Sequence, residues 1–215
     1  MLKIVVFDSG YGGELLADYL EDALPVIDIV RAIDWREAET IQHSGKLSRK
    51  LSEKFLQPYI GKVDLIVIAN FFISATSLKY FQRKYKNQKF IGLDLNSKNL
   101  AKVKSTVTFT TKAMSRTISY FQYAHQTKTK TIVLDDWPIL IDDGELGHGK
   151  IRRDLTSVIK DKPSQLFLAC GQFVDLKVEL KRLLGHNIKI VDNFDQVLHQ
   201  TCQTLKIRGS LKKQK

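Results

Sequence analysis

Cysteine, proline and long apolar stretches are all scarce in this sequence of 215 residues. Its cysteines, Cys170 and Cys202, are too few for the disulfide framework that stabilises small secreted domains. The longest apolar runs, residues 65–69 and 166–170, are far shorter than the roughly 20 residues that a membrane-spanning helix needs. The first seven residues predict a strand and not a secretory signal. We therefore expect a cytoplasmic protein with no membrane partner.

Low-complexity tracts are absent as well, and the sequence holds only four prolines. Hydrophobic residues make up 43% of the chain and charged residues 27%, which is ordinary for a globular protein. A chain of this length buries a substantial core as one large domain or as two small ones.

Negative charge is also in deficit, which leaves a formal net charge of +11. Basic residues concentrate in residues 79–86, 98–104 and 206–215. One interpretation is a nucleic-acid partner, because Lys and Arg interleaved with aromatic residues neutralise phosphates and stack on bases. The other interpretation is a solvated helix face with a basic terminus. We favour the second, because excess positive charge by itself speaks to solubility and non-specific binding.

Short apolar runs alternate with longer amphipathic stretches, a pattern typical of βαβ units and parallel sheets. We expect strands at residues 3–7, 27–33, 65–69, 90–93, 106–110, 131–134, 166–169 and 188–191. We expect helices at residues 14–24, 46–60, 74–84, 114–125, 150–160, 176–184 and 196–205. The fold class is therefore α/β.

The second half of the chain repeats the plan of the first. Residues 65–69 lead into Asn70, and residues 165–169 lead into Cys170. Likewise, residues 4–7 end at Asp8, and residues 107–110 end at Thr111. This order predicts two similar half-domains with mostly parallel sheets flanked by helices. Because ligands of such folds lie beyond the carboxyl ends of the strands, we expect these polar residues to line one cleft between the halves.

The segment from Asp8 to Gly13 reads Asp-Ser-Gly-Tyr-Gly-Gly. Its glycines permit a tight turn and close approach of the backbone to a ligand, and the following helix offers N-terminal amides to an anion. The spacing is not that of a dinucleotide fingerprint, and the chain has no phosphate-binding loop motif. By itself, such a turn is structural about as often as it is functional.

Residues 6–13 resemble the F-D-S-G-x-G-G opening of glutamate racemases and of the wider aspartate/glutamate racemase superfamily. Further segments resemble other motifs of that family in the same order. Residues 64–69 resemble its strand before A-C-N-T-A-S, with Ser74 and Ala75 at the end of that motif. Residues 110–113 resemble its A-T-x-x-T turn, residues 140–144 its L-I-E-x-G segment, and residues 168–173 its L-G-C-T-H-F motif.

The resemblance implies the half-domain boundaries and the site residues. One half-domain covers residues 1–97 plus 193–215, and the other covers residues 98–192. The family works without a cofactor, using two thiols on opposite faces of an amino-acid α-carbon. Carried over by position, the catalytic residues are Cys170, Asp8 and Asp142. The substrate-binding positions are Ser9, Gly10, Asn70, Phe71, Phe72, Ser74, Thr111, Gly171 and Gln172.

The match at the site is incomplete. Asn70 stands where the family has its first thiol, and an amide does not exchange protons at neutral pH. Phe71 and Phe72 replace the Asn-Thr pair that holds the substrate, Met114 replaces a threonine, and Gln172 replaces a histidine. A more apolar site pairs a substrate carboxylate poorly. We therefore expect a divergent member that is not a two-base racemase and that binds a small carboxylate, an amino-acid-like ligand or a protein partner.

Three alternatives stay open. The chain resembles one-cysteine relatives such as arylmalonate decarboxylase, which suggests an isomerase or decarboxylase with Cys170 as its proton donor. The others are a residual amino-acid racemase and a basic nucleic-acid-associated protein. A homodimer is also open. The histidines are scattered, so we expect no metal site. The acidic pairs at residues 135–136 and 142–143 could suggest a cation site, but a turn around Trp137-Pro138 explains them more simply. Residues 142–150 predict a loop, and Trp35 and Trp137 suit either the site or the core.

Overall fold

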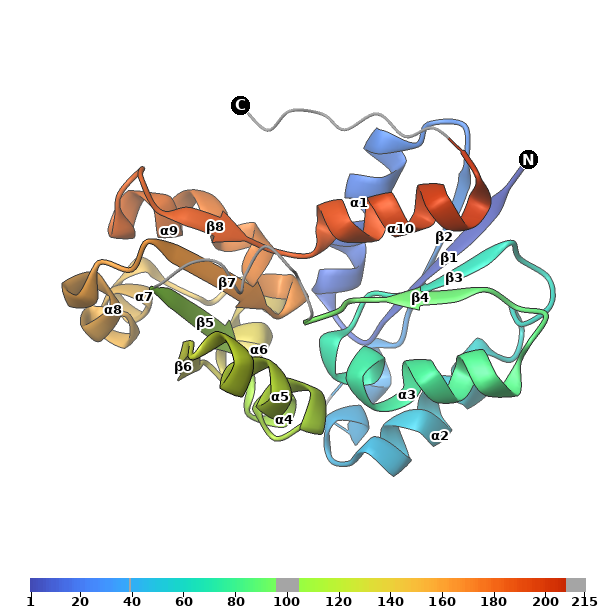
Figure 1. The fold of residues 1–215 in the computed structure, drawn as a ribbon, viewed down its shortest axis with the longest axis horizontal. Helices are drawn as coiled ribbons and strands as arrows, with labels where there is room; N and C mark the ends of the chain where they lie inside the picture. Colours follow the sequence, from blue (N-terminus) through green and yellow to red (C-terminus); the bar gives the residue numbers. More distant parts are fainter. Residues whose placement is uncertain (39, 96–104, 208–215) are drawn as a thin grey trace. The chain divides into compact units, whose positions relative to one another are not determined.

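The computed structural model describes residues 1–38, 40–95 and 105–207 of the chain. They form two compact units, one of Met1–Asp94 with Asn193–Lys215 and one of Leu95–Asp192. Each unit is built on a four-stranded parallel sheet (Figure 1). The prediction of an α/β fold with two parallel half-domains is therefore confirmed. The basic segment 98–104 and residues 208–215 of the basic tail lie outside the described residues.

The N-terminal unit has the strand order β2-β1-β3-β4. Its strands are β1 (Lys3–Asp8), β2 (Asp28–Ile33), β3 (Leu65–Ile68) and β4 (Phe90–Gly92). Its helices are α1 (Tyr11–Ala23), α2 (Gly45–Leu56), α3 (Phe71–Lys84) and α10 (Phe194–Leu205). Two 3₁₀ turns, η1 (Trp35–Glu37) and η2 (Thr40–Gln42), connect β2 to α2.

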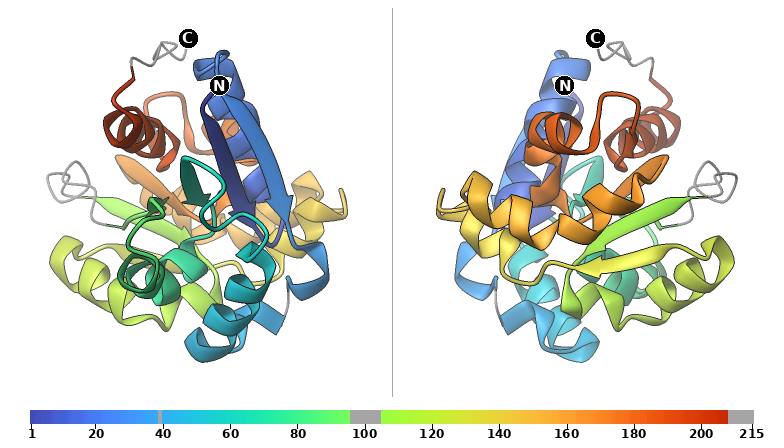
Figure 2. Two further views of the ribbon diagram at one scale, coloured as in Figure 1. Left: turned by 90° about the vertical axis from the view of Figure 1, so that its right-hand side faces the viewer. Right: turned by 90° about the vertical axis from the view of Figure 1, so that its left-hand side faces the viewer.

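Helices cover both faces of this sheet, with α1 and α10 on one face and α2 and α3 on the other (Figures 1 and 2). The two central strands, β1 and β3, are consequently almost entirely buried and consist of continuous apolar runs, as expected for strands packed on both faces. The core on the α2 and α3 side includes Val5, Phe7, Ile66 and Phe81.

The second unit has the strand order β6-β5-β7-β8. Its strands are β5 (Thr106–Thr110), β6 (Lys130–Val133), β7 (Gln165–Ala169) and β8 (Lys189–Val191). Its helices are α4 (Lys112–Ser115), α5 (Ile118–Thr127), α6 (Trp137–Asp142), α7 (His148–Asp154), α8 (Thr156–Asp161), η3 (Gly171–Leu176) and α9 (Lys177–Leu184).

The two sheets share one topology, because the first strand of each unit lies between the second and the third. Asn70 and Cys170 are equivalent positions, because each is the N-cap residue of the helix that follows the third strand of its unit. The repeat that the sequence suggested thus has a structural basis in matched strand order. All eight predicted strands are present, with ends that differ by a residue or two.

Two of the seven predicted helices are divided, and the other five differ from the structure at their ends, by up to four residues where α2 ends at Leu56. The helix expected at residues 114–125 is divided into α4 and α5, because Thr117 caps a new helix by accepting the backbone N–H of Tyr120 at 3.1 Å. The helix expected at residues 150–160 is divided at Leu155, which leaves the helical conformation while its side chain is fully buried. Helix α3 begins at Phe71, three residues before the predicted start.

The predicted turn at Trp137-Pro138 is the first turn of helix α6. Proline is tolerated there, because the N–H it lacks has no partner inside the helix. Trp137 is fully buried among Phe109 and Phe173, whereas Trp35 is 49% exposed. The loop predicted at 142–150 is shorter than expected, because α6 includes Asp142 and α7 begins at His148.

Across the described ranges, no helix combines the length and the apolar character needed to cross a membrane.

Candidate functional site

The glycine-rich turn after β1 brings α1 close to the end of the sheet. A Cβ atom on Gly13 would lie 2.5 Å from Cβ of Asp8 and 2.6 Å from Cδ1 of Ile33. Such distances are closer than side chains tolerate, so only glycine lets the helix begin here. Gly10 is the N-cap residue and supplies no side-chain cap, which leaves the first-turn amides of α1 without that partner.

Asn70 makes two hydrogen bonds that define its role. Its Oδ1 accepts the backbone N–H of Ile73 at 3.0 Å and so caps helix α3. Its Nδ2 donates to Oδ1 of Asp8 at 2.8 Å, and this carboxylate also accepts the N–H of Ser9 at 2.6 Å. Asp8 is 1% exposed. The structure thus brings Asp8, Ser9 and Asn70 together, and the side-chain amide of Asn70 holds the Asp8 carboxylate.

The other substrate-binding candidates of this unit lie in the first turns of α3. Phe71 and Phe72 are both buried, directly after Asn70. Ser74 is buried too, and its hydroxyl donates to the carbonyl of Ile68 at 3.1 Å and accepts the N–H of Leu93 at 3.1 Å. Ser74 therefore ties α3 to the ends of β3 and β4.

In the second unit, Thr111 follows β5 and caps the short helix α4. Its Oγ1 accepts the N–H of Met114 at 3.3 Å, and both residues are buried. The neighbouring Thr110 is fully buried, and its hydroxyl has no hydrogen-bond partner among the residues that the structure describes. Thr110 pairs with Ala169 of β7, so it lies beside the strand that ends at Cys170.

Cys170 lies directly after β7 in extended backbone conformation. Its thiol donates to Oε1 of Gln172, with a sulfur–oxygen distance of 3.1 Å. The side chain is 9% exposed and belongs to the hydrophobic core of this unit, together with Leu168 and Phe173. Gly171 is buried as well. Cys170 and Gln172 are thus brought together, in a setting where a thiol acts as a small core side chain.

Asp142 is exposed on the last turn of α6, a helix that packs against η3 and therefore near the segment after Cys170. Of the acids before it, Asp136 pairs with Lys150 at 2.7 Å, and the same lysine pairs at 2.8 Å with Asp154, which follows later in the chain. Within residues 1–38, 40–95 and 105–207, no three His, Cys, Asp or Glu side chains gather closely enough to hold a metal ion.

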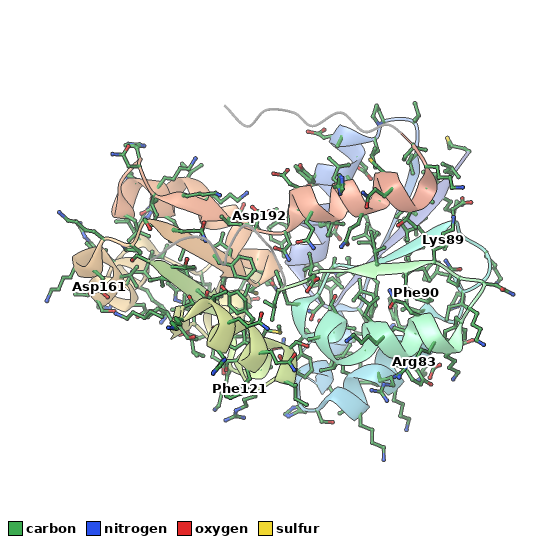
Figure 3. All side chains as sticks on the ribbon, in the orientation of Figure 1. Arg83, Lys89, Phe90, Phe121, Asp161 and Asp192 are labelled. Atoms are coloured by element: carbon green, nitrogen blue, oxygen red, sulfur yellow. The ribbon has the colours of Figure 1, made fainter. Side chains whose placement is uncertain are left out.

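The basic segment 79–86 ends helix α3. Lys84 pairs with Glu53 at 2.6 Å and donates to the hydroxyl of Tyr80 at 3.0 Å. Arg83 and Lys89 are exposed, whereas Phe90 beside them is buried in the core (Figure 3). The aromatic side chains of this segment pack on α2, β4 or local cations. The structure thus gives the aromatic residues of this segment a packing role.

Sequence reasoning placed Asn70 at the site as a lost thiol and missed what it does. The available signal was local, because asparagine before an apolar helix is a common N-cap. Its bond to Asp8 joins residues 62 positions apart and has no such signal.

No protein-family model and no curated protein matches the sequence. Solved structures do match. Glutamate racemase of Escherichia coli, in complex with L-glutamate and the activator UDP-MurNAc-ala, has a TM-score of 0.83 at 19% identity, covering 97% of this chain and 84% of that chain. Glutamate racemase of Francisella tularensis, in complex with D-glutamate, has a TM-score of 0.80 at 20% identity, covering 98% and 84%. Allantoin racemase of Pseudomonas fluorescens has a TM-score of 0.65 at 12% identity, covering 97% and 94%.

These similarities cover nearly the whole chain and agree with the resemblance carried by residues 6–13. The chain therefore has the α/β fold of the glutamate and allantoin racemases that it matches.

Proposed function

We propose that this protein binds a small carboxylate or amino-acid-like ligand beside the carboxyl ends of β1 and β3 and does not catalyse two-base racemisation. The observation that carries the proposal is the pair of hydrogen bonds made by Asn70. Two-base racemisation needs a group at this position that gives and takes a proton. The amide at Asn70 instead caps α3 and holds Asp8, two roles that a thiol does not fill equally well.

The environment of Cys170 supports the same conclusion. A reactive cysteine lies in an electropositive and accessible setting, since the thiolate is the reactive form. The thiol of Cys170 donates to the neutral amide of Gln172 and packs among apolar side chains. Structural cysteines buried among apolar side chains in this way are inert.

The proposed ligand follows from the groups at the end of β1. The N-terminus of α1 carries partial positive charge, which suits a carboxylate, and its N-cap residue Gly10 brings no side chain that would block the approach of a ligand. The Ser9 hydroxyl, 3.5 Å from Nδ2 of Asn70, and the Asp8 carboxylate suit an ammonium or hydroxyl group of the same ligand. An amino acid or a hydroxy acid presents both kinds of group.

The decisive experiment follows the α-proton of L- and D-glutamate and of L-aspartate by proton NMR in D₂O. We expect saturation transfer from protein to glutamate, which reports binding, but no loss of the α-proton signal beyond a protein-free sample. Solvent deuterium incorporation with racemisation that Cys170→Ser abolishes would overturn the assignment.

Binding is assigned to the site with a matched pair of variants. Ser9→Ala removes a hydroxyl from the proposed site, and Ser164→Ala removes an exposed hydroxyl of the second unit. We expect Ser9→Ala to weaken the saturation transfer and Ser164→Ala to leave it unchanged. An equal signal in both variants would count against this location.

A further inference from the structure

A pocket lies at the carboxyl end of β2, within the N-terminal unit. Its volume is about 350 Å³, and its wall consists of the segment after β2 together with one face of α2. The lining residues are Asp34, Arg36, Glu37, Leu51, Lys54 and Phe55. Asp8, Ser9 and Asn70 are not part of this wall, so the pocket is separate from the site described above.

The pocket wall contains two carboxylates and two cations, so its formal charges cancel. Asp34 immediately precedes η1, Glu37 is the last residue of η1, and Arg36 lies between them in the sequence. Lys54 projects from α2, where it shares a face with Leu51 and Phe55 because residues three and four apart are neighbours on a helix. Among the described residues, none of the four charged side chains forms an ion pair within 4.0 Å.

Asp34 is the unusual member of this set. It is 6% exposed, and its backbone N–H donates to the carbonyl of Asp8 at 2.9 Å, which fixes the residue at the end of the sheet. Burial raises the pKa of its carboxyl, and Glu37 adds to this, while the charges of Arg36 and Lys54 and a hydrogen bond from the backbone of Arg36 act in the opposite direction. The cations present therefore do not compensate the buried carboxylate fully.

The apolar part of the wall is held in place by the core. The ring of Phe55 stacks on Phe7 of β1 with centroids 5.4 Å apart. Leu51 packs against the same core. The pocket thus combines an apolar surface that the core holds in place with four charged side chains, so it is more polar than most small-molecule sites and suits a charged ligand.

From this arrangement we propose that the pocket binds a small zwitterion, a molecule with an ammonium group, a carboxylate and a short apolar body. The ammonium lies against Asp34 and Glu37, the carboxylate against Arg36 and Lys54, and the apolar body against Leu51 and Phe55. A ligand with one charged group would pair with only two of the four wall charges and would lose the second set of charge-assisted contacts.

The size of the pocket fits such a molecule. A water molecule occupies roughly 30 Å³ in the liquid, so the pocket has room for about a dozen waters or for a ligand of about ten non-hydrogen atoms. Ligands of that size commonly bind with dissociation constants on the order of 1 mM.

L-Leucine is the probe, since its branched body matches the apolar wall. Its two analogues each lack one charged group: 4-methylpentanoate has no ammonium, and 3-methylbutylamine has no carboxylate. Titrating L-leucine into the ¹⁵N-labelled full chain should shift the amide signals of residues 34–37 and 51–55. Each analogue should bind at least about tenfold more weakly than L-leucine.

The variants use neighbours on one helix. Lys54→Gln should weaken leucine binding about tenfold, and Lys50→Gln, at an exposed position outside the pocket wall, should leave it unchanged. Asp34→Asn should act like Lys54→Gln; if this variant does not fold, Glu37→Gln takes its place. Ser9→Ala should have no effect, which separates this site from the one at β1.

The proposal is overturned if L-leucine at about 10 mM shifts none of these amides, since a site of this class would then be mostly filled. It is equally overturned if the analogues bind as well as leucine, because the pocket would then recognise only an apolar body. Equal binding to Lys54→Gln and Lys50→Gln would also exclude it.

Discussion

Replacing Asn70 with aspartate tests whether its side chain supports Asp8, as the structure indicates. The new carboxylate keeps the N-cap, because aspartate and asparagine cap helices equally well. It also removes the donor that lies 2.8 Å from Oδ1 of Asp8 and places a second negative charge there. Two charges about 3 Å apart repel by about 5 kcal/mol at an effective dielectric constant of ~20. Residue 70 is only half-buried, so we expect a loss of roughly 2–4 kcal/mol of unfolding free energy at pH 7.

Asn70→Ala is the companion variant. It loses the cap, worth about 1 kcal/mol, and the hydrogen bond to a buried carboxylate, worth roughly 1–2 kcal/mol. The two variants differ in their response to acid. A proton shared by the carboxylate pair restores a hydrogen bond, so Asn70→Asp should approach the wild-type stability as the pH falls toward about 4. Asn70→Ala should not recover.

Urea denaturation followed by far-UV circular dichroism measures both effects, with each variant compared with the wild type at the same pH. Asn87→Asp, an exposed site in the same unit, is the control and should stay within about 0.5 kcal/mol of wild type. If Asn70→Asp is equally neutral at pH 7, the bond to Asp8 does not stabilise the fold and our account of Asn70 is wrong.

Two further predictions concern local packing. Gly13→Ala should destabilise the protein by about 1–2 kcal/mol, because the cost of overpacking against Asp8 and Ile33 exceeds the gain in helix propensity. Gly149→Ala is the control, because its Cβ would lie 3.5 Å from Arg153. In the same denaturation assay, it should be neutral or stabilising by up to about 1 kcal/mol. Burial raises the pKa of Tyr120 to about 12, so the folded chain favours the neutral phenol, and this contribution to stability is complete below about pH 10 and is lost as the pH rises toward 12. Ultraviolet difference titration of the wild type and of Tyr120→Phe should show that the variant lacks one phenol that ionises well above pH 10. If the phenol missing from the variant ionises near pH 10, the assignment to Tyr120 is wrong.

The sequence by itself determined the α/β class, the eight strands and the repeated plan of the two units. These features are local, because continuous apolar runs of four to six residues predict buried parallel strands wherever they occur. Residues 6–13 also sufficed to identify the family resemblance that the solved structures support as a fold. Helix ends were less predictable, since the divisions at Thr117 and Leu155 depend on a capping hydroxyl and on a buried leucine.

Only the tertiary structure decided what the site residues do. The sequence marked Asn70 as a replaced thiol, but its bond to Asp8 arises because β1 and β3 lie side by side in the sheet. The pocket at Asp34 likewise depends on α2 folding back over the end of β2, which brings Lys54 within reach of charges about twenty residues earlier in the chain. Contacts of this kind depend on strand order and helix packing, and no local pattern of residues encodes them.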